Sequence, residues 1–138
     1  MIRRAEPNDA KAIYEILSKT DDPWTMGVIE SELKTESSKA FVYLGDEGQV
    51  QGFVDIKILY DEADLMHIAV AEEMRGQGIG ARLLAQAIEE AEGKAIALEV
   101  RMGNFKAISL YEKYDFKKES VRKNYYHGED AAIMWRRK

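Results

Sequence analysis

The sequence places three glycines at alternate positions, Gly76, Gly78 and Gly80, between an apolar run and an amphipathic segment. Glycine lets the backbone approach a ligand closely, and the first N–H groups of a following helix have no intrahelical partners. Such a loop suits an anion, with phosphate or pyrophosphate as the natural ligand. A tight strand-to-helix turn without a ligand is the alternative. Triphosphate hydrolysis and dinucleotide binding are not indicated, because the sequence lacks a Lys followed by Ser or Thr after Gly80 and the G-x-G-x-x-G spacing.

A second candidate for chemistry is Glu99, an acid inside the segment IALEV. Ile96, Leu98 and Val100 alternate there, as in a strand that buries one face. A carboxylate in this position can accept a proton as a general base. An ion pair with Arg101 or with a neighbouring strand is the alternative, because acids are seldom buried unless they are paired.

The composition limits the classes of function. The 138 residues suit one domain, 1–138, and they include no cysteine and two histidines, so disulfides, thiol nucleophiles and a metal site are not expected. The net charge of −5 argues against nucleic-acid binding. No apolar run approaches a membrane span and the N-terminus lacks the apolar stretch of a secretory signal, so we expect a cytoplasmic protein without a membrane partner, and a monomer.

The elements that must hold these residues follow from hydrophobic periodicity. Helices are predicted over residues 7–19, from Met26 onward with Thr25 as its cap, over 81–93 and over 104–114. Strands are predicted over residues 2–5, 40–44, 50–60, 65–70, 96–100, 116–126 and 131–137. The segment 45–49 should join two strands as an antiparallel hairpin. The helix between strands 65–70 and 96–100 predicts a parallel crossover, with the glycine loop at the carboxyl end of the first strand.

The segment RGQGIG resembles the R/Q-x-x-G-x-G/A motif of the GNAT acetyltransferases, with Arg75, Gly78 and Gly80 at its fixed positions. The strand HIAV precedes it, as in that family. The resemblance runs from Ile2 to Met134. Within the family, the segments LEVRMGNFKAISLYEKYDF, RKNYY and EDAAIM look like the RimI-type ribosomal-protein alanine N-acetyltransferases.

This resemblance implies an α/β (α+β) GNAT fold, a mixed central sheet with splayed parallel central strands flanked by helices. It implies acetyl-CoA as the cofactor, with its pyrophosphate on the backbone of residues 75–80 and its pantetheine between the splayed strands. The cofactor-binding residues that it implies are Ile68, Ala69, Val70, Arg75, Gly76, Gln77, Gly78, Ile79, Gly80, Asn104 and Tyr111.

The resemblance also implies the reaction: transfer of acetyl to the N-terminal α-amine of a protein or peptide, for example a ribosomal protein. Glu99 matches the proposed general base of the RimI type, and Tyr111 matches the proposed general acid. Without the resemblance, Tyr111 would be interpreted as a half-buried aromatic residue of a helix, although its polar tip can still serve chemistry. We expect Trp24, Glu62 and Tyr125 to bind the acceptor.

Two other functions stay open at this point. The acceptor could be a lysine side chain or a small amine, or the domain could bind acyl-CoA without catalysis. The chain departs from the family pattern at Phe105, at Asp115 and in the short segment 126–129, which borders the expected peptide site. These departures concern the acceptor more than the cofactor.

Overall fold

The computed structural model describes residues 1–126 and 128–137, without the side chains of residues 125 and 126. Its strands are β1 (Ile2–Arg4), β2 (Ser38–Leu44), β3 (Val50–Ile58), β4 (Glu62–Val70), β5 (Ala95–Arg101), β6 (Lys117–Tyr126) and β7 (Glu129–Arg136). Its helices are α1 (Ala10–Leu17), α2 (Met26–Lys34), α3 (Ile79–Glu90) and α4 (Phe105–Lys113), with short 3-10 turns η1 (Pro7–Asp9) and η2 (Glu72–Met74). None of these described helices is long and apolar enough to span a membrane.

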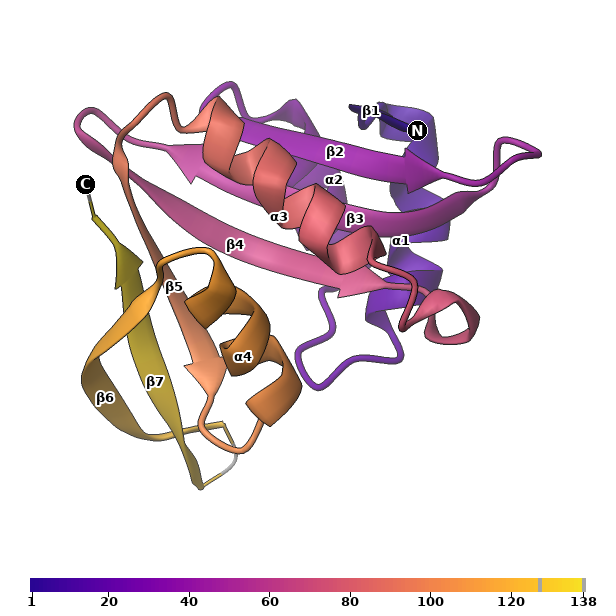
Figure 1. Ribbon diagram of the computed structural model, residues 1–138. Helices are drawn as coiled ribbons and strands as arrows, with labels where there is room; N and C mark the ends of the chain where they lie inside the picture. The colour runs from indigo at the N-terminus through magenta and orange to yellow at the C-terminus, as the bar shows by residue number, and fades with distance from the viewer. Residues whose placement is uncertain (127, 138) are drawn as a thin grey trace.

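The described strands form one mixed sheet in the order β1-β2-β3-β4-β5-β7-β6 (Figure 1). β2 and β3 pair antiparallel across the predicted hairpin, and β4 and β5 pair parallel through the α3 crossover. The last hairpin inserts β7 between β5 and β6. Both predicted pairings and the predicted mixed sheet are confirmed.

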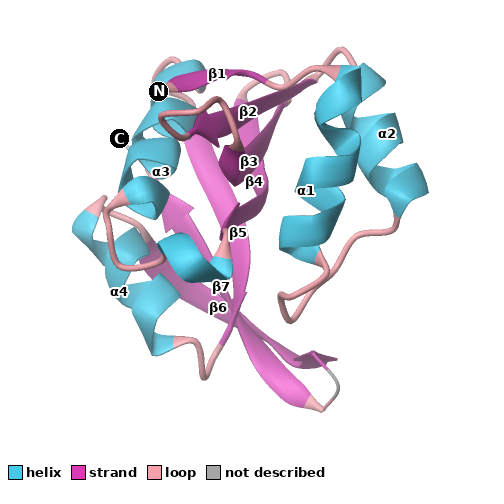
Figure 2. Cartoon of the chain, turned by 90° about the vertical axis from the view of Figure 1, so that its right-hand side faces the viewer, coloured by secondary structure: helices cyan, strands magenta, loops and turns pink. Residues whose placement is uncertain are grey.

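Helices cover both faces of the sheet. α3 and α4 lie on one face, and α1 and α2 lie on the other (Figures 1 and 2). Strand alternation divides the core accordingly: Val54 and Leu98 pack with α3 and α4, whereas Phe53 and Ala69 pack with α1 and α2. Each strand of the sheet centre therefore presents successive residues to two different environments.

The helix ends largely follow local sequence signals. Thr25 Oγ1 accepts a hydrogen bond from the Val28 N–H as the N-cap of α2, as predicted, and Asn104 Oδ1 accepts one from Ala107 at the start of α4. The predicted first helix is wrong at its start, because residues 7–9 form a 3-10 turn in which the Asp9 carboxylate binds Arg3 and the Glu6 N–H.

Other boundaries differ by a few residues. α3 begins at Ile79 rather than at residue 81, since Gly78 in the left-handed conformation ends the loop earlier. β4 begins at Glu62, three positions before the apolar run that predicted it, because pairing with β3 extends into the polar turn.

The parallel contact of β4 and β5 is short. Glu62, Ala63 and Asp64 pair with residues 95–97, and the two strands then separate. β5 continues instead along β7, with pairs from Ile96 to Arg101. The resulting gap in the middle of the sheet confirms the splayed central strands.

Two carboxyls, a buried one on β3 and a half-buried one on α2, connect α2 to the sheet. Asp55 of β3 is fully buried, and neither of its carboxyl oxygens receives a hydrogen bond from the part of the chain that the structure describes. Burial, with the adjacent Glu32 of α2, raises the pKa of Asp55 to about 8, so that the protonated Asp55 can donate a hydrogen bond to Glu32. Glu32 also accepts from the Ser38 hydroxyl at 2.9 Å and from Lys57 Nζ at 3.5 Å, and these bonds hold its pKa low despite its own burial.

Candidate functional site

A cleft of about 770 Å³ occupies the gap between β4 and β5. The carboxyl halves of both strands line it, together with the glycine loop, the first turn of α3, the cleft side of α4 and the loop that follows α1. Of the predicted cofactor-binding residues, this lining includes Ile68, Ala69, Val70, Arg75, Gly76, Gly78, Ile79, Gly80, Asn104 and Tyr111; Gln77 lies outside it.

The glycine loop has the geometry of an anion cradle. Gly76 and Gly78 have φ angles of 83° and 82°, and a Cβ at either position would meet no atom within 4 Å. The left-handed backbone, rather than crowding, therefore calls for glycine at both positions. α3 begins directly afterwards, and its first N–H groups have no intrahelical acceptor. Arg75 Nε donates a 3.4 Å hydrogen bond to the Val70 carbonyl, which links the loop to the end of β4.

The cleft passes through the sheet and has different chemistry on each face. Leu98, Val100 and Tyr111 belong to the core under α3 and α4, so the glycine loop and Tyr111 share that face. Glu99 alternates to the opposite face, where the loop between α1 and α2 lines the cleft with residues 19–22. Glu99 and Tyr111 therefore reach the same gap from opposite sides of the sheet.

Tyr111 and Asn104 fix the α4 side of the cleft. Tyr111 is buried on α4, and its ring packs against Phe116 with the ring centroids 5.8 Å apart. Asn104 combines two functions, because it caps α4 and also lines the cleft. The helix therefore begins at the cleft and presents Tyr111 to it two turns later.

Glu99 carries both an ion pair and an unpartnered oxygen. Its Oε1 lies 3.2 Å from Nη2 of Arg122, a residue of β6. Its Oε2 is buried and has no hydrogen-bond partner among the described residues. The sequence left an ion pair with Arg101 or with a neighbouring strand open, and the structure assigns the partner to β6, beyond the adjacent strand β7.

Arg101 instead joins the two segments that border the Glu99 side of the cleft. Its Nη2 lies 2.6 Å from Asp21 of the loop between α1 and α2, and its Nη1 lies 3.4 Å from Glu129 at the start of β7. Partial burial by itself would lower the pKa of Arg101, because it disfavours the charged guanidinium. The two carboxylates favour the charged form more strongly, so the pKa of Arg101 is raised. Glu129 also accepts a hydrogen bond from the Gly103 N–H at 2.8 Å.

Sequence reasoning missed Asp21, Arg122 and Glu129 as parts of this site. Asp21 lies between two helices, and Arg122 and Glu129 lie on the last hairpin, so no local periodicity links them to Glu99. The signal available in the sequence was the two-residue spacing of Glu99 and Arg101, which puts both side chains on one face of a strand.

The predicted acceptor-binding residues lie apart from one another. Trp24 is half-buried and packs edge-on against His67 and Phe53, with centroid distances of 5.1 and 6.2 Å, and it lies outside the cleft lining. Glu62 lies at the paired end of β4 and β5, near the charge of Arg137, and is likewise outside the lining. The side chain of Tyr125 lies outside the described residues. His67 Nε2 lies 2.8 Å from the Asp22 carbonyl oxygen, which accepts the hydrogen bond, so this histidine ties β4 to the loop between α1 and α2.

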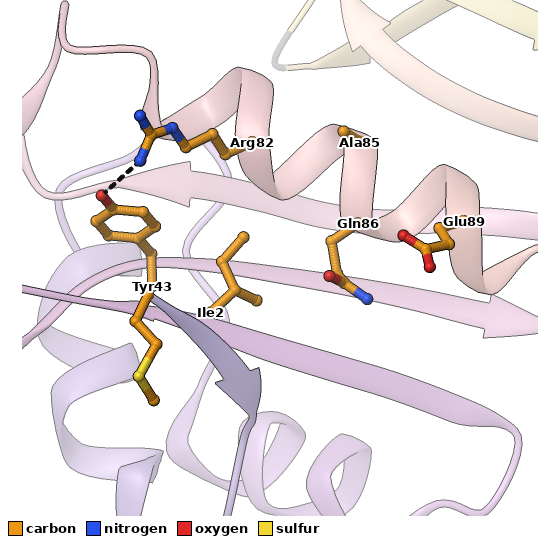
Figure 3. A pocket seen from close by; sticks show the side chains of 7 residues that line it. Ile2, Tyr43, Arg82, Ala85, Gln86 and Glu89 are labelled. Carbon is orange, nitrogen blue, oxygen red and sulfur yellow. Dashed lines mark hydrogen bonds between the residues drawn. The ribbon is translucent and has the colours of Figure 1, made fainter.

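A second, smaller hollow of about 350 Å³ lies between α3 and the β1–β2 edge (Figure 3). The Arg82 guanidinium donates a 3.1 Å hydrogen bond to the Tyr43 hydroxyl across it, and Gln86 and Glu89 border it. Neither the glycine loop nor Glu99 or Tyr111 contributes to its lining, so we assign the chemistry to the larger cleft.

Comparison with known proteins gives the same picture. Residues 10–116 match the family described as Acetyltransferase (GNAT) family. The chain is 35% identical over 145 residues to the ribosomal protein bS18-alanine N-acetyltransferase of Escherichia coli (strain K12), covering 96% of this chain and 94% of that protein. A crystal structure of the ribosomal-protein-S18-alanine N-acetyltransferase from Escherichia coli superposes with a TM-score of 0.90 at 34% identity, covering 98% of this chain and 91% of the other. The Ard1 structure from Thermoplasma volcanium has a TM-score of 0.90 at 30% identity, with 99% and 95% coverage.

Proposed function

Because the chain belongs to the GNAT acetyltransferase family, we propose that it transfers the acetyl group of acetyl-CoA to the N-terminal α-amine of a protein. The observation that carries this proposal is the shared cleft: Glu99 and Tyr111 line one gap in the sheet from opposite faces. Acyl transfer to an amine needs a group that accepts a proton from the amine and a group that donates a proton to the leaving sulfur. The carboxylate on one face suits the first role, and the hydroxyl on the other face suits the second.

The cleft fits the proposed cofactor. The backbone of residues 75–80 and the first turn of α3 would hold the pyrophosphate, since this loop combines left-handed glycines with free helix N–H groups. The edges of β4 and β5, unpaired with each other beyond Asp64 and Ala97, would hold the pantetheine arm. When bound, acetyl-CoA supplies an acetyl group activated as a thioester.

In the proposed reaction, two side chains move protons. Glu99 Oε2, buried and without a hydrogen-bond partner among the described residues, accepts the proton that the acceptor amine must lose before its nitrogen can attack the carbonyl carbon. With acetyl-CoA bound, the Tyr111 hydroxyl would supply the proton that the leaving thiolate needs. Packing of its ring against Phe116 restricts this side chain, so that the hydroxyl needs little reorientation.

Of the acceptors considered, an α-amine is the easiest to deprotonate at this site. Its reference pKa is near 8, about two units below that of lysine, so less free energy is needed to deprotonate it at neutral pH. The relative from Escherichia coli, by name a ribosomal protein bS18-alanine N-acetyltransferase, supports the same acceptor class. The acidic and basic groups around Glu99 form a polar opening suited to a peptide chain rather than to an apolar amine.

Release of CoA thiol from acetyl-CoA tests the proposal. The panel contains peptides with free N-termini, the same peptides with blocked N-termini and an internal lysine, and small polyamines. We expect turnover with the free N-termini. Turnover confined to lysines or polyamines would refute the proposed α-amine acceptor, although the assignment of the fold would still hold.

The role of Glu99 needs a separate variant. Glu99→Gln keeps the size of the side chain and removes the proton acceptor, so kcat should fall by about 10² to 10⁴, the usual contribution of a general base, while acetyl-CoA still binds. Glu112→Gln, an exposed acid of α4, is the matched control and should leave kcat unchanged. Full activity of the Glu99 variant would refute the assignment.

A further inference from the structure

Arg122 is a charged residue of β6 that reaches the proposed base across an intervening strand. The register pairs both Arg101 of β5 and Arg122 of β6 with Ala131 of β7, so these three residues form one row across the sheet. Glu99 pairs with Ile133, two rows along, and therefore faces the same side of the sheet. Ala131 is small and fully buried, which leaves room for the Arg122 guanidinium to pass over it and approach Glu99 Oε1 at 3.2 Å.

The ion pair divides the carboxylate into two unequal oxygens. Oε1 is bound by Arg122, whereas Oε2 is buried beside the cleft without a hydrogen-bond partner among the described residues. A carboxylate held at one oxygen has a restricted terminal torsion, and its other oxygen keeps a defined direction. This arrangement therefore suits a carboxylate that accepts a proton through only one of its two oxygens.

Stability does not account for this pair. The side chains of Arg122 and Glu99 are 51% and 29% exposed. Ion pairs with such exposure add little to the free energy of folding, because solvent screens the charges and two long side chains lose rotamer freedom. A pair that contributes little to folding but contacts the proposed base is better explained by its effect on the base.

We propose that Arg122 is a positioning residue: it binds Oε1 of Glu99 and thereby directs Oε2 at the acceptor amine. This inference rests on the proposed function, in which Glu99 is the general base. Arg122 is remote from the glycine loop along the sheet, so its contribution concerns the acceptor half of the reaction and leaves the binding of acetyl-CoA unchanged.

The expected effect follows from the contact. Loss of the ion pair and of the orientation that it enforces should lower kcat/KM for the peptide by about 10-fold in Arg122→Gln. Arg122→Lys keeps the charge but not the planar guanidinium, so it should recover part of this loss. Lys123→Gln, the neighbouring exposed residue on β6, is the matched control and should not change kcat/KM.

A double-mutant cycle with Glu99→Gln distinguishes positioning from a general effect on the fold. If Arg122 acts through Glu99, Arg122→Gln should lower kcat/KM about 10-fold in the wild-type background but by less than about 2-fold when residue 99 is already glutamine. The KM for acetyl-CoA should stay the same in all four proteins. Circular dichroism checks that each variant is folded, and Arg122→Lys gives the same comparison if Arg122→Gln is not.

Each outcome decides a different claim. An equal loss in both backgrounds, or no loss in the wild-type background, would overturn the positioning role of Arg122 and leave the proposed function intact. Full activity of Glu99→Gln alone would overturn the assignment of the base, and with it this inference. Acetyl transfer to lysine rather than to the α-amine would overturn the acceptor class while the cycle still reports on Arg122.

Discussion

Replacement of Asp55 by asparagine should remove most of the pH dependence of folding between pH 5 and 7. Asp55 is fully buried in β3, beside Glu32 of α2 and near Lys57, and burial raises its pKa to about 8 from an ordinary value of 3.8. Asparagine has nearly the same shape, carries no titrating proton, and its amide can donate to the Glu32 carboxylate as the protonated Asp55 does.

The sign and size follow from proton binding. Between pH 3.8 and about 8 the folded protein holds a proton at Asp55 that the unfolded chain has released, so stability is greatest at low pH and is lost as the pH rises through this interval. The slope for one proton is about 1.4 kcal/mol per pH unit, or up to about 3 kcal/mol from pH 5 to pH 7. Glu32, whose pKa is lowered, contributes the opposite slope, but only below its ordinary value of 4.5.

The assay is denaturant unfolding at pH 5, 6 and 7 for the wild type, Asp55→Asn and Asp46→Asn. Asp46 is an exposed acid in the β2–β3 turn and serves as the control. The free energy of unfolding should fall with pH in the wild type and in the control, and should stay nearly level in Asp55→Asn. Parallel curves for all three proteins would refute the buried, protonated Asp55.

Three further predictions concern the cleft. Gly78→Ala should raise the KM for acetyl-CoA, whereas Gly48→Ala in the β2–β3 turn, with the same left-handed strain of about 1 kcal/mol, should lower stability without changing that KM. Tyr111→Phe keeps the packing and removes the hydroxyl, so rapid-quench kinetics should show kcat reduced by about 10² or more at unchanged melting temperature. Asp21→Asn breaks a half-exposed ion pair with Arg101. Steady-state kinetics should show the KM for the peptide rising about 2- to 5-fold, while the KM for acetyl-CoA stays unchanged.

Much of the fold was predictable because its signals are local. The turn at 45–49 fixes a hairpin, Thr25 caps α2, and the glycines at 76 and 78 take the left-handed conformation that the loop requires. The parallel crossover follows from one helix between two apolar strands. These features depend on residues close together in the chain.

The acceptor side of the cleft was less predictable because its contacts are distant in sequence. Arg122 of β6 reaches Glu99 of β5 across the intervening strand β7, and Asp21 reaches Arg101 from the loop between α1 and α2. Trp24, which we expect to bind the acceptor, packs against Phe53 and His67, and its role in acceptor binding stays a prediction.

The central claim is that the acceptor is an N-terminal α-amine, and one peptide tests it most directly. The peptide carries a free N-terminal alanine and an internal lysine, and it is incubated with acetyl-CoA and the enzyme and then sequenced by tandem mass spectrometry. We predict a single acetyl group on the alanine nitrogen. This acetylation should be lost when Glu99 is replaced by glutamine. Acetyl on the lysine with a free N-terminus would contradict the account.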